Sequence, residues 1–171
     1  MVEANGILVE LFERIDGHVE SVLDGIDDAL LNTPPAPGTN PVGWLVWHLT
    51  RVQDSHIAEL VDDDQIWVTG GWAERFGVAA DPHNSGYGHS PEEVAAIQPD
   101  GVGALLGYYD AVATRTRAFL DELGPEDLDR IVDERWDPPV TMLVRLVSIA
   151  DDDIQHAGQA AYARGLLHQG R

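Results

Sequence analysis

The 171-residue chain contains no cysteine and no lysine. Without cysteine it cannot form a disulfide, a thiolate metal site or a cysteine nucleophile. Any sulfur chemistry must therefore use a thiol that a substrate brings in. All ten basic residues are arginine, and they stand against thirty Asp and Glu, so the formal net charge is −20 at pH 7.

This excess of acid limits the partners that the surface can attract. A surface this negative repels phosphate backbones and anionic lipid headgroups, so we expect neither nucleic acid nor a membrane as a partner. No apolar run approaches the roughly 18 residues of a membrane-spanning helix, and the first five residues lack a signal-peptide pattern. The length and the apolar fraction of 44% predict one globular domain over residues 1–171, which we expect to be cytoplasmic.

Apolar residues at helical spacing predict four long helices, over residues 4–31, 41–61, 101–123 and 140–167. Asn40 is the expected N-cap of the second helix, with Pro41 at its first position. The connection over residues 62–99 is rich in Gly, Pro and Trp, and Ser90 and Pro91 mark a short capped helix within it. There is no internal repeat and no alternating strand pattern. The sequence therefore predicts an all-α fold, a four-helix bundle with one long crossover connection.

The fourth helix carries residues with metal chemistry. Asp152 and His156 are four apart, so their side chains leave one face of the helix a single turn from each other. A carboxylate and an imidazole at this spacing can hold two positions of one divalent metal, and a third ligand must come from elsewhere. The apolar stripe that we expect to face the core consists of Leu143, Val147, Ala150, Ile154, Ala157 and Ala161.

His48 on the second helix is the candidate third ligand, because it lies in the apolar setting of Trp47 and Leu49. Other interpretations stay open. An Asp and a His four apart are a common surface pair, and a lone His48 could be a hydrogen-bonded core histidine. Three consecutive Asp at 151–153 would usually face solvent, yet they lie midway along an apolar helix, where a cation would offset their repulsion.

Three segments of the chain match a known family. They read NPVGWLVWHL at residues 40–49, GYGH at 86–89 and DDIQHAGQA at 152–160. Together they resemble the DinB/YfiT-like superfamily, and within it the actinobacterial mycothiol-dependent enzymes. The resemblance implies a four-helix bundle that binds a divalent metal, usually zinc or nickel, through His48, Asp152 and His156. The chain departs from the family at Asp152, where many members have His and the mycothiol-dependent maleylpyruvate isomerases have Glu.

The resemblance also implies a reaction, the transfer of mycothiol to an electrophile in detoxification. Zinc stabilises the thiolate of a thiol that it binds, which supplies a nucleophile without a protein cysteine. The expected partners are thus a small-molecule thiol and an electrophilic substrate, and a homodimer is compatible with the sequence. Three alternatives are a metal-dependent hydrolase, a mycothiol-dependent isomerase on the same scaffold and a non-catalytic metal-binding stress protein.

Four neighbouring residues are further candidates for the site. Arg145 lies two turns before Asp152 and could orient it or bind an anionic group, with an ordinary salt bridge as the alternative. Asp54 could accept a hydrogen bond from a histidine ligand. Tyr87 and His89 lie in a Gly-rich turn that could fold over the metal, although an exposed loop position is the favoured interpretation of His89.

Two further predictions concern side chains near the three ligands. His56 follows His48 by eight residues and so lies about 12 Å further along the helix, too far to share the metal. Gln155, directly before His156, is expected to face outward.

Overall fold

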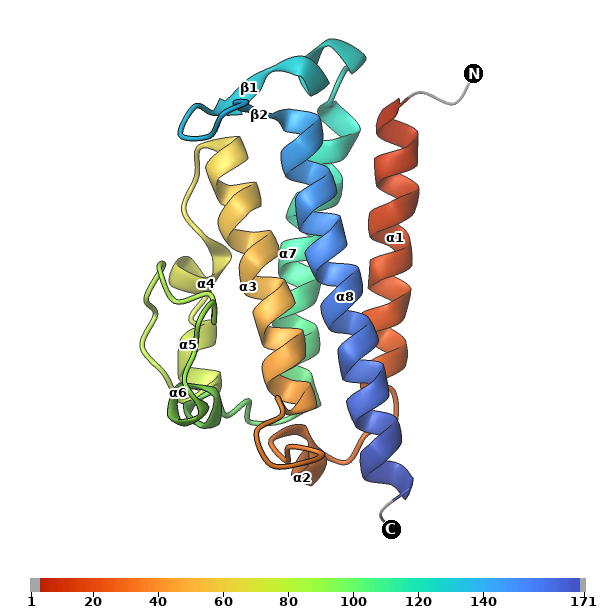
Figure 1. The fold of residues 1–171 in the computed structure, drawn as a ribbon, viewed down its shortest axis with the longest axis vertical. Coiled ribbons are helices and arrows are strands. Elements are labelled where there is room, and N and C mark those ends of the chain that lie inside the picture. The colour runs from red at the N-terminus through yellow and green to blue at the C-terminus, as the bar shows by residue number, and fades with distance from the viewer. Residues whose placement is uncertain (1–3, 170–171) are drawn as a thin grey trace.

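Four long helices form a bundle in the computed structural model, which describes residues 4–169 (Figure 1). Figure 1 shows α1 and α8 running in one direction and α3 and α7 in the other. The all-α prediction is confirmed, and no helix within residues 4–169 is long and apolar enough to cross a membrane. The four helices are α1 (Ala4–Leu23), α3 (Val42–Val61), α7 (Val102–Glu122) and α8 (Met142–Gln169).

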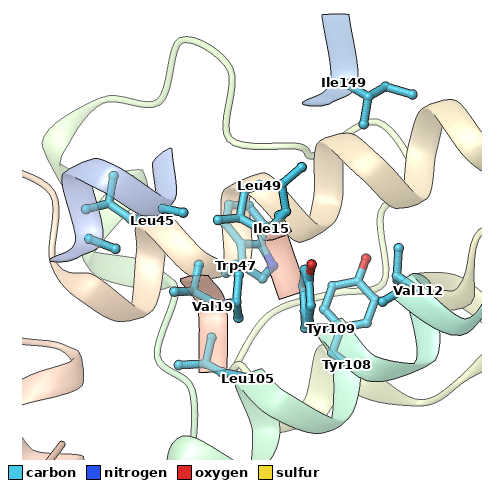
Figure 2. Packing of buried hydrophobic residues seen from close by; sticks show 14 of the residues in the cluster. Ile15, Val19, Leu45, Trp47, Leu49, Leu105, Tyr108, Tyr109, Val112 and Ile149 are labelled. Atoms are coloured by element: carbon cyan, nitrogen blue, oxygen red, sulfur yellow. The ribbon is translucent and has the colours of Figure 1, made fainter. Parts of the chain in front are cut away.

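All four long helices supply the core. Each buries apolar residues at intervals of three and four, which places them on one face of the helix. Figure 2 shows how side chains from the four helices meet, with two tyrosines of α7 beside the aliphatic residues. The residues labelled there are Ile15 and Val19 of α1, Leu45, Trp47 and Leu49 of α3, Leu105, Tyr108, Tyr109 and Val112 of α7, and Ile149 of α8.

The long crossover exists because α3 and α7 point the same way. The chain leaves α3 at one end of the bundle and must return to the other end before α7 can begin (Figure 1). On this path lie α4 (Ile66–Thr69), α5 (Trp72–Arg75) and α6 (Pro91–Ala96). The predicted capped helix is α6, in which Ser90 and Glu93 form a reciprocal capping box.

The first connection differs from the prediction of one helix over residues 4–31. α1 ends at Leu23, Gly25 adopts a left-handed conformation with φ of +66°, and a separate α2 (Asp28–Leu31) follows. Asp27 caps α2, since its side chain accepts a hydrogen bond from the N–H of Ala29 at 3.0 Å. The expected N-cap of the next helix is also wrong by one residue, because Pro41 takes that position and the Asn40 side chain does not cap α3.

The prediction that the chain has no strands is wrong at the connection between α7 and α8. A 3-10 helix, η1 (Pro125–Asp129), leads into an antiparallel pair of β1 (Ile131–Asp133) and β2 (Val140–Thr141). α8 therefore begins at Met142 rather than at residue 140. Strands of two and three residues are too short to show an alternating pattern in the sequence.

The predicted core stripe of α8 is largely wrong. Of its six residues only Ala150 and Ala157 are buried, whereas Leu143, Val147 and Ile154 are 39–48% exposed. Relative to the predicted orientation, α8 is rotated about its axis so that Asp153 faces the core. The prediction placed only apolar residues on the buried face and therefore excluded this carboxylate. The buried face consists of Met142, Leu146, Ile149, Ala150, Asp153, Ala157, Ala160 and Ala163.

Candidate metal centre

His48, Asp152 and His156 come together between the middle of α3 and the middle of α8, which pack side by side. One ligand atom from each residue lies within 4.8 Å of the other two. The rings of His48 and His156 meet edge to face, with centroids 4.5 Å apart. His48 is buried, and the other two side chains are half-buried, so the group is open on one side. The structure thus brings together the three residues that the sequence selects as ligands.

The orientation of His48 is fixed by a main-chain contact. Its Nδ1 lies 2.5 Å from the carbonyl oxygen of Ser85, which can only accept, so Nδ1 carries the proton and Nε2 is left as the metal-binding atom. Trp44, one turn earlier, stacks on the ring at 4.8 Å. Burial lowers the pKa of His48, although the Ser85 hydrogen bond acts in the opposite direction. A neutral imidazole with one fixed tautomer is the form that binds a metal.

His156 is held by the residue one turn before it. Its Nδ1 donates a hydrogen bond to the main-chain oxygen of Asp152 at 2.9 Å and lies 3.3 Å from Oδ2 of the same residue. Burial alone would lower the pKa of His156, but these contacts with Asp152 raise it above its ordinary value. Oδ2 of Asp152 is buried and accepts no hydrogen bond within the described part of the chain.

The three residues fit a divalent metal. A buried carboxylate oxygen without a donor is costly, and a cation beside it would remove that cost. Two imidazoles and one carboxylate are ligands that zinc and nickel both accept, and three protein ligands leave at least one position for a further molecule.

The three consecutive Asp residues point in three directions. Asp151 is exposed and accepts a hydrogen bond from Gln155, which also faces outward as expected. Asp152 faces the ligand group. Asp153 is fully buried in the core, where its two oxygens have no partner among residues 4–169, and burial together with the charge of Asp152 raises its pKa well above the ordinary value.

The crossover forms a close wall against His48. Gly86 has φ of +94°, and a Cβ atom on it would lie 2.8 Å from Nδ1 of His48 and 2.9 and 3.0 Å from the rings of Trp47 and Trp44. Only glycine satisfies both the backbone conformation and this approach. The predicted turn therefore does cover the site, but it does so through its backbone.

The two candidate side chains of that turn do not act as predicted. Tyr87 is 94% exposed, so its ring points away from the ligands. His89 is half-buried rather than an exposed loop histidine. It accepts from Nε1 of Trp44 at 3.3 Å, contacts Asn84 Oδ1 at 2.7 Å and stacks on Trp47, which ties the crossover to α3. It is not part of the ligand group.

Asp54 does not contact a histidine ligand. Its carboxylate is fully buried and accepts from the N–H groups of Ile66 and Trp67 at 3.0 and 2.8 Å, which caps α4, and from the hydroxyl of Tyr108 at 2.8 Å. The role predicted for Asp54 is taken by the carbonyl of Ser85. A main-chain oxygen 37 residues away leaves no mark in the sequence around His48.

Arg145 forms a salt bridge, which was the alternative interpretation. Its guanidinium donates to Asp133 of β1 at 2.9 Å and to Nδ1 of His56 at 2.9 Å, and within the described chain it forms no hydrogen bond or ion pair with Asp152. His56 accepts because it is neutral: burial, followed by the charge of Arg145, lowers its pKa. His56 is outside the ligand group, as its position along α3 predicts.

Arg51 is a residue that the sequence did not select. It is fully buried and donates five hydrogen bonds, two of them to the crossover carbonyls of Pro82 and Asn84 at 3.1 and 3.0 Å. The other three go to Asp54, Gln65 and the hydroxyl of Tyr108. Since Asn84 directly precedes Ser85, Arg51 holds the segment that orients His48.

Comparison with known proteins identifies the same architecture. The model of the DinB superfamily matches residues 11–160, a range that contains all three ligand residues. The crystal structure of a conserved protein from Enterococcus faecalis is similar over 97% of this chain and 98% of its own, with 34% sequence identity and a TM-score of 0.88. Among curated proteins, none matches this chain.

Proposed function

The chain belongs to the DinB superfamily, and from this premise we propose that it is a metal-dependent transferase that joins a low-molecular-weight thiol to an electrophile. The observation that carries the proposal is the group of His48, Asp152 and His156, with three ligand atoms within 4.8 Å and an open side. We propose zinc as the ion, with nickel as the alternative, and mycothiol as the thiol.

The composition of the chain supports a thiol from outside. A chain without cysteine has no sulfur nucleophile of its own. A divalent metal held by two imidazoles and a carboxylate would favour deprotonation of a bound thiol at neutral pH, because neutral imidazoles leave more positive charge on the ion than thiolate ligands would.

The residues around the site orient the two histidine ligands and cover one side of His48. Ser85 and the main-chain oxygen of Asp152 fix the two imidazoles, so the ligand set is arranged before a metal or substrate binds. Trp44 and Gly86 cover His48 on the side of the crossover, which leaves the opposite side for reactants.

The proposed reaction is a displacement or an addition. The thiol loses its proton to solvent, and the sulfur forms a bond to the electrophilic carbon. In a displacement the leaving group departs with the electron pair of the broken bond. In an addition to an activated double bond, the electron pair of that bond takes up a proton from solvent, so that the thiol adds across it.

A panel of thiols tests the proposal. Protein loaded with Zn²⁺ is mixed with 1-chloro-2,4-dinitrobenzene and with mycothiol, bacillithiol, glutathione or cysteine, and conjugate formation is followed by absorbance. We expect conjugation of mycothiol to be faster with the Zn²⁺-loaded protein than with the metal-free protein. The His156→Ala variant should lose this acceleration. The His83→Ala variant, which removes an exposed crossover histidine, is the matched control and should react like the wild type. If no thiol is accelerated but an activated ester is cleaved, the protein is a hydrolase and the transferase proposal is wrong.

A further inference from the structure

A cleft lies beside the candidate metal centre, between the C-terminal half of α8 and the proline-rich connector that precedes α3. Its volume is about 310 Å³, at the lower end of the range for small-molecule sites. The side chains that matter for its chemistry are Thr39, Asn40, Leu45, Gln159, Tyr162 and Leu166.

The cleft begins one helical turn from two of the metal ligands. Leu45 precedes His48 by three residues on α3, and Gln159 follows His156 by three residues on α8. Residues three apart on a helix have Cβ atoms about 5–6 Å from each other. A molecule of the size of a substituted benzene ring that occupies the cleft would therefore lie about one helical turn from the ligand group.

The lining is uncharged in a chain with forty charged residues. Every residue that lines the cleft is apolar or neutral polar, although the net charge of the chain is −20. Leu166 is 39% exposed and Tyr162 is 71% exposed, so an aromatic face and an aliphatic side chain are available to a ligand. This lining suits a neutral, apolar molecule, because burial of a charge here would have no compensating partner.

Two amide side chains give the cleft a polar end. Asn40 does not cap α3, since Pro41 is the N-cap, and neither Asn40 nor Gln159 makes a side-chain hydrogen bond within residues 4–169. An amide can donate as well as accept, so the pair can bind a carbonyl or nitro oxygen of a ligand.

The connector forms a preformed wall. Pro35 lines the cleft, and the turn after it is closed by hydrogen bonds between Thr39 and Ala36: the Thr39 hydroxyl donates to the Ala36 oxygen at 2.7 Å and accepts from the Ala36 N–H at 3.1 Å. A wall of this kind loses little conformational entropy when a ligand binds.

We propose that this cleft binds the electrophilic substrate, a neutral molecule with an aromatic or aliphatic body and a carbonyl or nitro oxygen. Its body packs on Leu45, Tyr162 and Leu166, and its oxygen accepts from Asn40 or Gln159. The inference rests on the proposed function for the identity of the ligand as an electrophile, but the cleft can be tested without any reaction.

The first experiment measures binding of the neutral fluorophore N-phenyl-1-naphthylamine to the Zn²⁺-loaded protein. Leu166→Asp introduces a charge into the lining, and we expect it to raise the Kd about tenfold or more. Leu143→Asp is the matched control, because Leu143 is 41% exposed on the same helix but lies outside the cleft, and it should leave the Kd unchanged. Equal affinity of the wild type and Leu166→Asp would overturn the proposal. So would sedimentation of the wild type as a dimer that Leu166→Asp dissociates, because a second copy would then cover the cleft.

The second experiment separates this proposal from the proposed function. The KM for 1-chloro-2,4-dinitrobenzene should rise about tenfold in Leu166→Asp, while the metal content and the KM for the thiol stay at the wild-type values. Transfer with an unchanged KM in this variant would refute the cleft and leave the transferase standing. Loss of fluorophore binding in Leu166→Asp, in a protein that transfers no thiol, would support the cleft and refute the transferase.

Discussion

Arg51 and Arg145 lie on the two helices that carry the ligand group, yet they hold different parts of the chain. Arg51, fully buried on α3, binds main-chain carbonyls of the crossover, and the next residue after its partner Asn84 is the one that orients His48. Arg145, on α8, is 12% exposed and binds Asp133 of β1 at the end of the bundle. The position of Arg145 in the sequence suggested that it orients Asp152, whereas the contacts show that Arg51 holds the segment that orients His48.

Each of the two arginines affects the site only through the residues that its partners contact. Arg51 donates to the carbonyl of Asn84, and the adjacent carbonyl of Ser85 accepts from His48. The hydrogen bonds of Arg145 end at β1 and His56. We therefore expect substitutions that disturb the crossover to change both stability and metal affinity. Substitutions that disturb the contact between α8 and β1 should change stability alone.

The largest effect is expected for Arg51→Met. This change leaves the carbonyls of Pro82 and Asn84 without their buried donor and removes the cation beside Asp54, so we expect a loss of about 3 kcal/mol or more in the free energy of unfolding. Urea denaturation measures it. Equilibrium dialysis with Zn²⁺ should show weakened binding under conditions where the variant is folded, and Arg145→Met, tested in parallel, should bind Zn²⁺ like the wild type. Equal metal affinity in both variants would remove the distinction between the two arginines.

The next effect is expected for Gly86→Ala. Its Cβ atom would approach Nδ1 of His48 to 2.8 Å on a left-handed backbone, so we expect a loss of about 2–3 kcal/mol in the free energy of unfolding and a metal affinity reduced about tenfold. Gly88→Ala is the matched control: Gly88 has φ of +74°, but nothing lies within 4 Å of an added Cβ. It should lose only about 1–2 kcal/mol, the cost of the backbone conformation, and keep its metal affinity. A Gly88→Ala variant that binds metal as weakly as Gly86→Ala would show that the close approach to His48 is irrelevant.

A smaller effect is expected for Arg145→Gln. The glutamine can keep one hydrogen bond to Asp133 but removes the ion pair, and Arg135 still pairs with the same carboxylate, so we expect only a small loss in the free energy of unfolding. Thermal or urea unfolding should show this difference, and the Zn²⁺ affinity should not change. Weakened metal binding in this variant would restore the role that its position on the face of Asp152 suggested.

A change in the stability at acid pH is expected for Asp133→Asn. Hydrogen bonds from Arg135, followed by the charges of Arg135 and Arg145, hold the pKa of Asp133 well below its ordinary value. A depressed carboxyl pKa stabilises the folded state above the pKa of the unfolded chain, near 4, and this contribution is lost as the pH falls toward the folded-state pKa. The difference in urea midpoint between the wild type and Asp133→Asn should therefore shrink between about pH 5 and pH 2. A difference that stays constant over this range would mean that Asp133 titrates normally.

Much of the site could be predicted from the sequence because its signals are local. The i, i+4 spacing of Asp152 and His156 and the apolar setting of His48 make the three residues candidates, and the resemblance to the DinB/YfiT-like superfamily selects them as a ligand set. The parallel course of two helices requires a long crossover. The residues that orient the ligands escaped prediction for a physical reason. Ser85 acts through its main-chain carbonyl, which every residue has, so it leaves no signature in the sequence. Gly86 lies in the turn that was expected over the metal, but its close approach to His48 depends on the absence of a side chain and on the packing of the fold.

The errors on α8 have a different origin. The buried face includes Asp153. A prediction from the positions of apolar residues assigns a face with a carboxylate to solvent, so it gave α8 the wrong orientation. As a result Leu143, Val147 and Ile154 were placed in the core although they are exposed. A buried charge can be recognised only from the packing of the other helices around it.

The most direct measurement is the metal content of the protein after dialysis against Zn²⁺. The wild type should hold one Zn²⁺ per chain, His156→Ala should hold none at the same free metal concentration, and His83→Ala should match the wild type. The same metal content in His156→Ala and in the wild type would contradict the assignment of His48, Asp152 and His156 as a metal centre.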